Sequence, residues 1–147
     1  MFCVSLDKLY HNVFPNTKKV LCLSTAASIY GLTNQWGVPF TFFYEDGYMS
    51  QVGYIYGIKL NSLKEKEYKV IISNMLCTTL EQTIKDLIIA KEYPLIIECI
   101  ANYLDDNEDE EDDTISFEAI NKLNLSKNEI LYVKSLKSKI ESYIRRG

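Results

Sequence analysis

The middle of the sequence carries its clearest β-strand pattern. β-branched and aromatic residues follow one another there in the run Val38-Pro39-Phe40-Thr41-Phe42-Phe43-Tyr44. Such residues favour an extended backbone because their side chains pack well on a pleated surface. Residues 45–48 form a turn sequence with Gly47, and residues 52–60 continue in aromatic and β-branched residues. A third strand is predicted over residues 68–72.

Helical patterns lie on both sides of these predicted strands. Before them, residues 5–14 carry apolar side chains at helical spacing behind a Ser5 cap, and Gly31 ends a second pattern over residues 24–30. After them, helices are predicted from Thr78, over 94–104, over 116–123 and over 126–146. The sequence therefore predicts an α+β fold. Its small, mostly antiparallel sheet of about three strands is flanked by N-terminal helices and a C-terminal helical bundle.

Length and composition indicate one soluble globular domain over residues 1–147. Hydrophobic residues make up 47% of the chain and charged residues 24%, and no apolar run approaches the roughly 18 residues of a membrane-spanning helix. The N-terminus lacks the basic and apolar regions of a signal peptide, so we expect a cytoplasmic protein. Cys3, Cys22, Cys77 and Cys99 are far apart in apolar surroundings, which predicts buried thiols and no metal site.

The net charge of −4 is concentrated in one segment. Residues 1–104 hold nine basic and nine acidic residues, and residues 114–147 hold seven basic and three acidic ones. Between them lies an acidic tract, residues 105–113, which we expect to be a flexible loop that can meet a basic partner. Its carboxylates belong to Asp105, Asp106, Glu108, Asp109, Glu110, Glu111, Asp112 and Asp113.

Residues 114–147 are predicted to be a helical C-terminal extension with a basic last helix. This helix is a second candidate surface for a partner, although the same charges also suit a solvated helix end. Its basic residues are Lys127, Lys134, Lys137, Lys139, Arg145 and Arg146.

Two short motifs stand about 55 residues apart. The first runs over residues 20–33 and ends a helical pattern with Gly-Leu-Thr; the second runs over residues 76–87, where Thr78 and Glu81 have the spacing of a capping box. In this order and spacing the motifs resemble those of the AbiEi-type antitoxin family, over roughly residues 20–104. The residues that carry the resemblance are Ser24, Tyr30, Gly31, Leu32, Thr33, Thr78, Glu81, Thr83 and Asp86.

The resemblance implies a non-enzymatic antitoxin of an abortive-infection toxin–antitoxin system, a form of phage defence. Such a protein neutralises a nucleotidyltransferase-type toxin by binding it, so the implied partner is the cognate toxin and no cofactor is implied. Full-length members usually carry an N-terminal winged helix that binds DNA, and we expect this chain to lack it because only residues 1–19 precede the first motif. Read from the residues alone, Thr78, Glu81, Thr83 and Asp86 also suit a helix cap and its packing.

Other functions remain open on parts of the sequence. A helix-turn-helix from Ser24 onward, or the basic last helix, would suit a DNA-binding transcriptional regulator, and an inhibitor carried by a phage or mobile element and acting on another host factor is a further alternative. The sequence also matches the residue pattern of a nuclease whose carboxylates hold Mg²⁺, at Asp46, Glu67 and Lys69. The aromatic strands suit base stacking, but no Lys or Arg lies between residues 38 and 58 to neutralise a nucleic-acid backbone.

Overall fold

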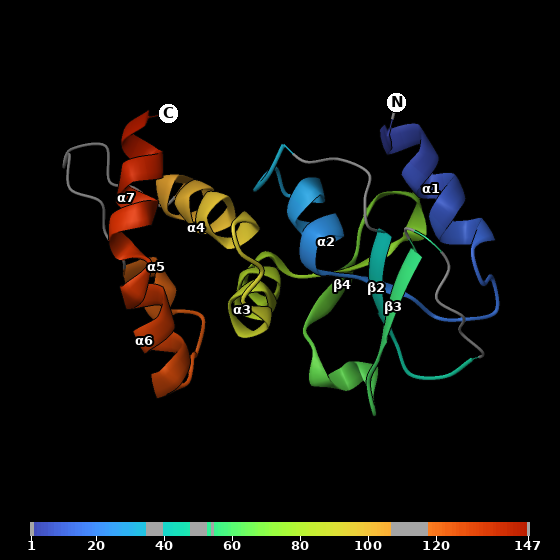
Figure 1. Cartoon of the computed structure of the whole chain (residues 1–147). Coiled ribbons are helices and arrows are strands. Elements are labelled where there is room, and N and C mark those ends of the chain that lie inside the picture. Colours follow the sequence, from blue (N-terminus) through green and yellow to red (C-terminus); the bar gives the residue numbers. More distant parts are fainter. Residues whose placement is uncertain (1, 35–39, 48–52, 54, 107–117, 147) are drawn as a thin grey trace.

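The computed structural model describes residues 2–34, 40–47, 53, 55–106 and 118–146, and within these the side chains of residues 2–5, 106, 145 and 146 are not described. Five strands form one mixed sheet in the order β3-β2-β1-β5-β4 (Figure 1). The strands are β1 (Val20–Leu21), β2 (Phe40–Tyr44), β3 (Ile55–Lys59), β4 (Tyr68–Val70) and β5 (Leu76–Thr78).

The sheet differs from the prediction of about three mostly antiparallel strands. β1 pairs with β2 and β4 pairs with β5 antiparallel, whereas the β1–β5 and β2–β3 pairs are parallel. Phe40 lies opposite Ile55 and Tyr44 opposite Lys59, so the turn sequence after Tyr44 does not close a hairpin. The prediction of an α+β fold is confirmed, but the strand count and the strand directions were wrong.

Seven helices accompany the sheet in the part of the chain that the structure describes. α1 and α2 precede most of the strands and α3 to α7 follow the last one. Their bounds are α1 (Phe2–Asn12), α2 (Leu23–Ile29), α3 (Leu80–Ala90), α4 (Leu95–Asp106), α5 (Glu118–Asn121), α6 (Lys127–Ser135) and α7 (Lys137–Arg146).

The helix ends correct several predicted caps. α1 begins at Phe2, so Ser5 lies inside the helix. α2 begins at Leu23 after Cys22, so Ser24, at which the predicted pattern began, lies in its first turn and is not the N-cap. Gly31 has φ +72 directly after Tyr30, the C-cap of α2, as the predicted helix end requires. The predicted helix over 126–146 is divided at Leu136 into α6 and α7.

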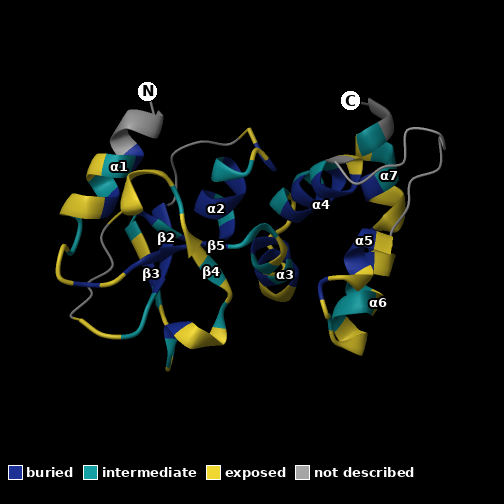
Figure 2. Cartoon of the chain, turned by 180° about the vertical axis from the view of Figure 1, so that it is seen from behind, coloured by how far each residue is buried: buried dark blue, intermediate teal, exposed yellow. Residues whose placement is uncertain are grey.

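Two apolar clusters hold these elements together. The larger cluster runs from Val20 in the sheet through α3 and α4 to Ile140 in α7, and the smaller one packs Leu6 and Tyr10 of α1 against Phe40 and neighbouring sheet residues. In Figures 1 and 2 the sheet and α1 occupy one end of the molecule, α4 to α7 the other, and α2 and α3 lie between them. We call the sheet together with α1 and α2 the sheet half, and α3 to α7 the bundle half.

Among the described residues, the burial of the cysteines and the hydropathy of the helices agree with the expectations from the sequence. Cys22, Cys77 and Cys99 are free and buried, as predicted, and the Cys3 side chain lies outside the description. Burial raises the pKa of the Cys77 thiol and of the Cys99 thiol to about 12, so both stay neutral near pH 7. Within the described ranges no helix is long and apolar enough to cross a membrane.

Candidate functional site

The two sequence motifs meet in the structure. Tyr30, at the end of α2, donates a hydrogen bond of 2.7 Å from its hydroxyl to the backbone oxygen of Thr78, at the end of β5. The same Tyr30 ring has the Lys69 ammonium 5.6 Å from its centroid. Burial raises the pKa of the Tyr30 hydroxyl, so this group remains a donor over the physiological range.

Two buried threonines continue this connection into α3. The Thr78 and Thr83 hydroxyl oxygens lie 2.7 Å apart, and the Thr83 hydroxyl donates to the backbone oxygen of Thr79 over 2.8 Å. Because Thr83 has only one hydroxyl proton, Thr78 must be the donor in the pair. Both side chains are fully buried, so these bonds fix β5 against the first turn of α3.

The buried Asp86 carboxylate forms an ion pair with the half-buried Lys66, a residue that the sequence motifs did not include. Its Oδ1 accepts from the Lys66 ammonium at 2.7 Å and from the Gln82 amide at 2.9 Å. Its Oδ2 is buried and has no hydrogen-bond partner among the described residues. Burial raises the pKa of the Asp86 carboxyl, while the bond and the charge of Lys66 oppose that rise.

The Gly-Leu-Thr end of the first motif joins the sheet half to the bundle half. Glu98 of α4 accepts one hydrogen bond from the Thr33 hydroxyl at 3.1 Å and another from the Asn34 backbone N–H at 2.9 Å. Asn102, one turn later on α4, donates from its amide to the backbone oxygen of Leu32 at 2.8 Å. We call these three bonds the α4 latch.

Two other motif residues lie away from these bonded groups. Glu81 is exposed in the first turn of α3, where its charge suits the helix dipole. It does not complete the predicted capping box, because Thr79 is the N-cap and accepts from the Gln82 backbone. Ser24, in α2, lines a cavity between β3 and the turn that joins α3 to α4.

The two candidate partner surfaces are described only in part. In the acidic tract, Asp105 is exposed. Asp106 ends α4, and its side chain is not described. The other six acids lie outside the described residues: Glu108, Asp109, Glu110, Glu111, Asp112 and Asp113. On the basic last helices, Lys127, Lys134 and Lys137 are exposed, and Lys137 approaches Glu141 at 3.9 Å. The side chains of Arg145 and Arg146 are not described.

The structure does not bring the residues of the predicted nuclease pattern together. Asp46 follows the end of β2, whereas Glu67 precedes the start of β4. These strands run in the same direction with β1 and β5 between them, so the two carboxylates lie at opposite ends of non-adjacent strands. Among the residues that the structure describes, no group of three potential metal ligands occurs.

The sequence did not predict the two cavities that lie beside the turn between α3 and α4. Two cavities flank the turn that joins α3 to α4, and Tyr93 lines both. The first, which we call the α4–α7 pocket, has a volume of about 650 Å³; the second, of about 550 Å³, opens between β3 and this turn. The α4–α7 pocket is lined by Tyr93, Glu98, Ser138, Lys139, Ser142 and Tyr143, among others.

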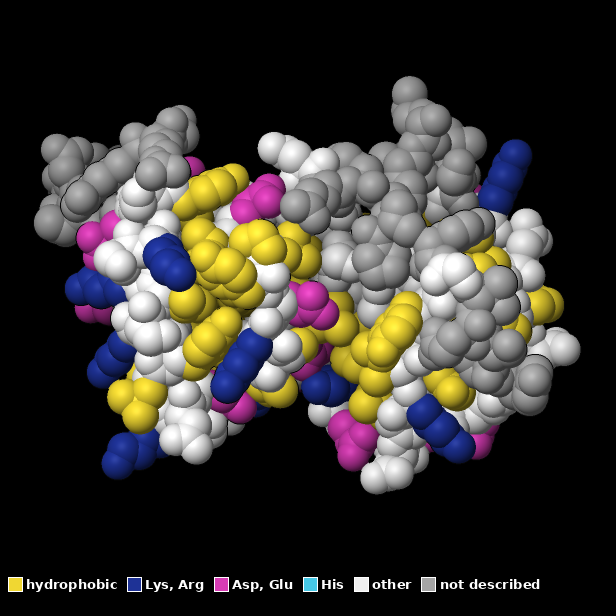
Figure 3. All heavy atoms as spheres, in the orientation of Figure 1, with side chains coloured by type: hydrophobic (Ala, Val, Ile, Leu, Met, Phe, Trp, Pro, Cys, Tyr) yellow, Lys and Arg dark blue, Asp and Glu magenta, His cyan; other side chains and the backbone are white. Residues whose placement is uncertain are grey.

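Exposed tyrosines mark this face of the molecule. Tyr56, Tyr93 and Tyr143 are 53%, 57% and 40% exposed, and Figure 3 shows hydrophobic side chains gathered over α4 and α7 and again over the sheet. The sequence features that relate to this face are the eleven tyrosines of the chain and the four-residue spacing of Lys139 and Tyr143. Neither signal specifies that residues near 93 and near 140 share a cavity.

In comparisons with known proteins, no family model, no curated protein and no solved structure matches this chain.

Proposed function

We propose that this protein is a non-enzymatic antitoxin of the AbiEi-like type, which neutralises a nucleotidyltransferase-type toxin by binding it. The observation that supports this proposal most directly is the Tyr30–Thr78 hydrogen bond of 2.7 Å. It joins the two motifs on which the family resemblance rests, and their other buried polar residues extend the same connection into α3 and α4. The motifs thus serve as the frame of the molecule, and the toxin would meet other surfaces.

The acidic tract is the first surface that we assign to the toxin. A protein that handles nucleotides or RNA needs basic residues around its active cleft, and eight carboxylates within nine residues offer that cleft a substitute for phosphates. Attraction of this kind accelerates encounter and weakens as salt screens the charges. The complex should therefore form more slowly at high ionic strength.

Co-expression with a nucleotidyltransferase-type toxin from the same cells tests the proposal. The full chain should restore growth, and the two purified proteins should elute together in gel filtration. Replacing the eight acids of the tract by Asn and Gln should slow association and flatten its salt dependence, because the charge is lost while the chain length is kept. Asp46→Asn, which removes an exposed carboxylate beyond β2, is the matched control and should bind as the wild type does.

The outcomes separate the parts of this proposal. If the full chain neither restores growth nor elutes with the toxin, the antitoxin function is wrong. If it does both and the neutralised tract associates as fast as the wild type, the toxin meets a different surface.

A DNA-binding regulator is the second candidate, favoured by the exposed Lys127, Lys134 and Lys137 of the bundle half. Under that function the chain would shift duplex DNA in a gel in the absence of toxin. The shift would weaken with salt, and replacing the three lysines by Ala would reduce the slope of that dependence. A DNA shift without toxin binding would favour this function over the antitoxin.

A further inference from the structure

The α4–α7 pocket combines aromatic rings, hydroxyls and a cation. Its volume of about 650 Å³ lies within the range of small-molecule sites. One wall is the turn before α4, with Tyr93, and the other is α7. These walls are about 45 residues apart in the chain and meet because α4 and α7 pack against each other.

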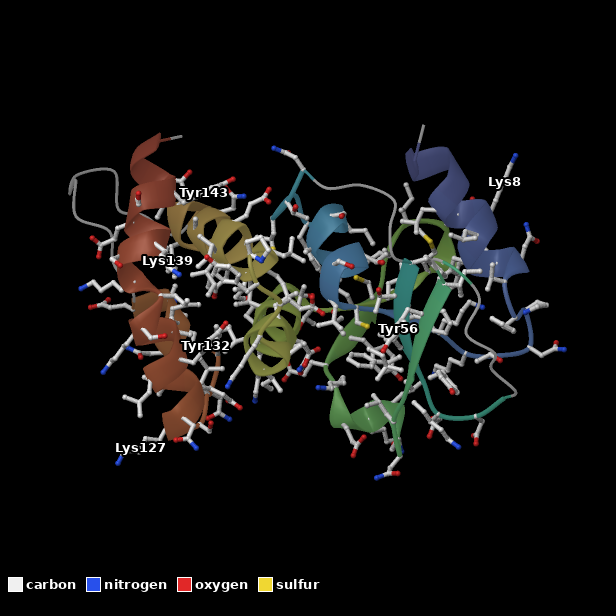
Figure 4. All side chains as sticks on the ribbon, viewed as in Figure 1. Lys8, Tyr56, Lys127, Tyr132, Lys139 and Tyr143 are labelled. Atoms are coloured by element: carbon white, nitrogen blue, oxygen red, sulfur yellow. The ribbon has the colours of Figure 1, made fainter. Side chains whose placement is uncertain are left out.

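One side of α7 is built for this pocket. Leu136 and Ile140 are buried in the core, and the neighbouring stripe carries two pairs at four-residue spacing, Ser138 with Ser142 and Lys139 with Tyr143. Residues four apart lie above one another on a helix. All four of these side chains line the pocket, and Figure 4 shows Lys139 and Tyr143 on the side of α7 that faces α4.

Lys139 supplies a positive charge that no carboxylate neutralises among the described residues. Its ammonium donates to the Tyr93 hydroxyl at 3.3 Å and lies 4.9 Å from the centroid of that ring. The one carboxylate of the pocket, Glu98, already accepts two hydrogen bonds in the α4 latch. An anion that enters the pocket would therefore find a cation held in place by an aromatic ring.

The hydrogen-bonding groups of the lining limit the kind of ligand. Lys139, Ser138, Ser142 and the hydroxyls of Tyr93 and Tyr143 can all donate. A wholly apolar ligand would cover these donors without replacing their bonds to water, which costs binding energy. A phosphate group offers several acceptor oxygens and a negative charge. The Tyr93 and Tyr143 rings, both well exposed, add surfaces on which a flat ring can stack.

We propose that the α4–α7 pocket binds a nucleoside phosphate, with the base against the Tyr93 and Tyr143 rings and the phosphate at Lys139 and the two serines. A free nucleotide and the phosphorylated 5′ end of a strand share this chemistry. The proposal is independent of the antitoxin function, since it concerns neither the acidic tract nor the toxin.

Isothermal titration of the full chain with AMP, GMP, CMP and UMP, and with the corresponding nucleosides, tests the proposal. Lys139→Ala should weaken monophosphate binding roughly tenfold, because one charge-assisted hydrogen bond is lost, and should leave nucleoside binding unchanged. Tyr143→Ala should weaken nucleotides and nucleosides alike by roughly five- to a hundredfold, through lost stacking. Tyr143→Phe keeps the ring and should retain most of the affinity.

Lys122→Ala is the matched control. Lys122 is an exposed lysine directly after α5, outside the pocket lining, and its replacement should leave every affinity unchanged. A 5′-phosphorylated oligonucleotide and its 5′-hydroxyl counterpart separate the two sources of the ligand. Binding of the free monophosphates supports a free nucleotide, and binding of the phosphorylated strand alone supports a strand end.

Two results would overturn the proposal. One is the absence of binding by both the monophosphates and the phosphorylated oligonucleotide at millimolar concentration. The other is wild-type affinity in both single variants, Lys139→Ala and Tyr143→Ala, since a ligand bound elsewhere on the chain would not respond to either change.

Discussion

Asp86 is a carboxylate taken almost completely out of water, with only one of its two oxygens bonded in the described structure. The Lys66 ammonium at 2.7 Å compensates part of the desolvation, and the Gln82 amide adds a second donor. Removing one partner of such a pair leaves a buried charge unsatisfied and is strongly destabilising. Asp86→Asn removes the buried charge itself and leaves the Lys66 ammonium, which is partly exposed, in contact with water.

The pH dependence of stability tests the state of Asp86. Its pKa is raised in the folded protein, so this group favours folding below its unfolded pKa of about 3.9 and loses that contribution as pH rises through the folded pKa. The free energy of unfolding of the wild type, relative to that of Asp86→Asn, should therefore fall between about pH 4 and neutral pH. Urea unfolding of both proteins across this range measures the difference, and a constant difference would contradict the assignment.

The sequence identified Asp86 but not its partner. The motif pattern placed Asp86 on a helix together with Thr83, and the structure has both residues buried in α3. Lys66 lies 20 residues earlier, at the end of the single turn Leu63–Glu65, and no local spacing connects the two positions. The pair exists because the chain between β3 and β4 folds back onto α3.

At the scale of single elements, α3 is fixed at its start by Thr79. The Thr79 hydroxyl accepts from the Gln82 backbone N–H at 3.3 Å, which satisfies one of the free donors of the first turn. Thr79→Ala should lower the free energy of unfolding by about 1 kcal/mol. Chemical denaturation measures this loss, and Thr79→Ser, which keeps the hydroxyl, is the control. An equal loss in both variants would show that the side-chain cap is not the cause.

Elements with long periodic patterns were predictable and very short ones were not. α3 and α4 follow the helices predicted after Thr78 and after Pro94, because their apolar residues recur at helical spacing over eleven or twelve positions. β1 and β5 hold two and three residues, too few to show a period. The break at Leu136 has no Gly or Pro to announce it; α6 packs on α3 while α7 packs on α4, so the chain changes direction there.

At the scale of the whole molecule, the α4 latch bonds the sheet half to the bundle half. Glu98→Gln removes the negative charge and leaves one acceptor oxygen for the Thr33 hydroxyl and the Asn34 N–H. Because Glu98 is only partly buried, we expect a loss of about 1 kcal/mol in the free energy of unfolding. Hydrogen exchange should rise at Asn34, whose N–H is the reporter of the latch.

Glu92→Gln is the control for the latch. Glu92 is an exposed carboxylate in the turn before α4, and its replacement should change stability by less than about 0.5 kcal/mol. If Glu98→Gln matches this control in stability and in exchange at Asn34, the latch does not stabilise the fold.

The candidate site depended on the whole molecule more than on any motif. The motif residues were found in the sequence because cap and helix-end patterns are local, and the structure gives most of them framework contacts. The α4–α7 pocket joins Tyr93 to Lys139 and Tyr143 across about 45 residues, and only the packing of α4 on α7 brings them together. Local patterns do not encode such a cavity.

The position of β1 in the sheet also bears on how the chain folds during synthesis. β1 is the central strand, and its neighbours are β2, at Phe43, and β5, at Leu76. A ribosome makes Val20 and Leu21 long before residue 76 emerges, so the central strand must wait for one of its two partners. Until then the Val20 and Leu21 side chains, which are wholly buried in the folded protein, remain accessible to chaperones. Closing the long loop between β1 and β5 is the step that should limit the rate of folding.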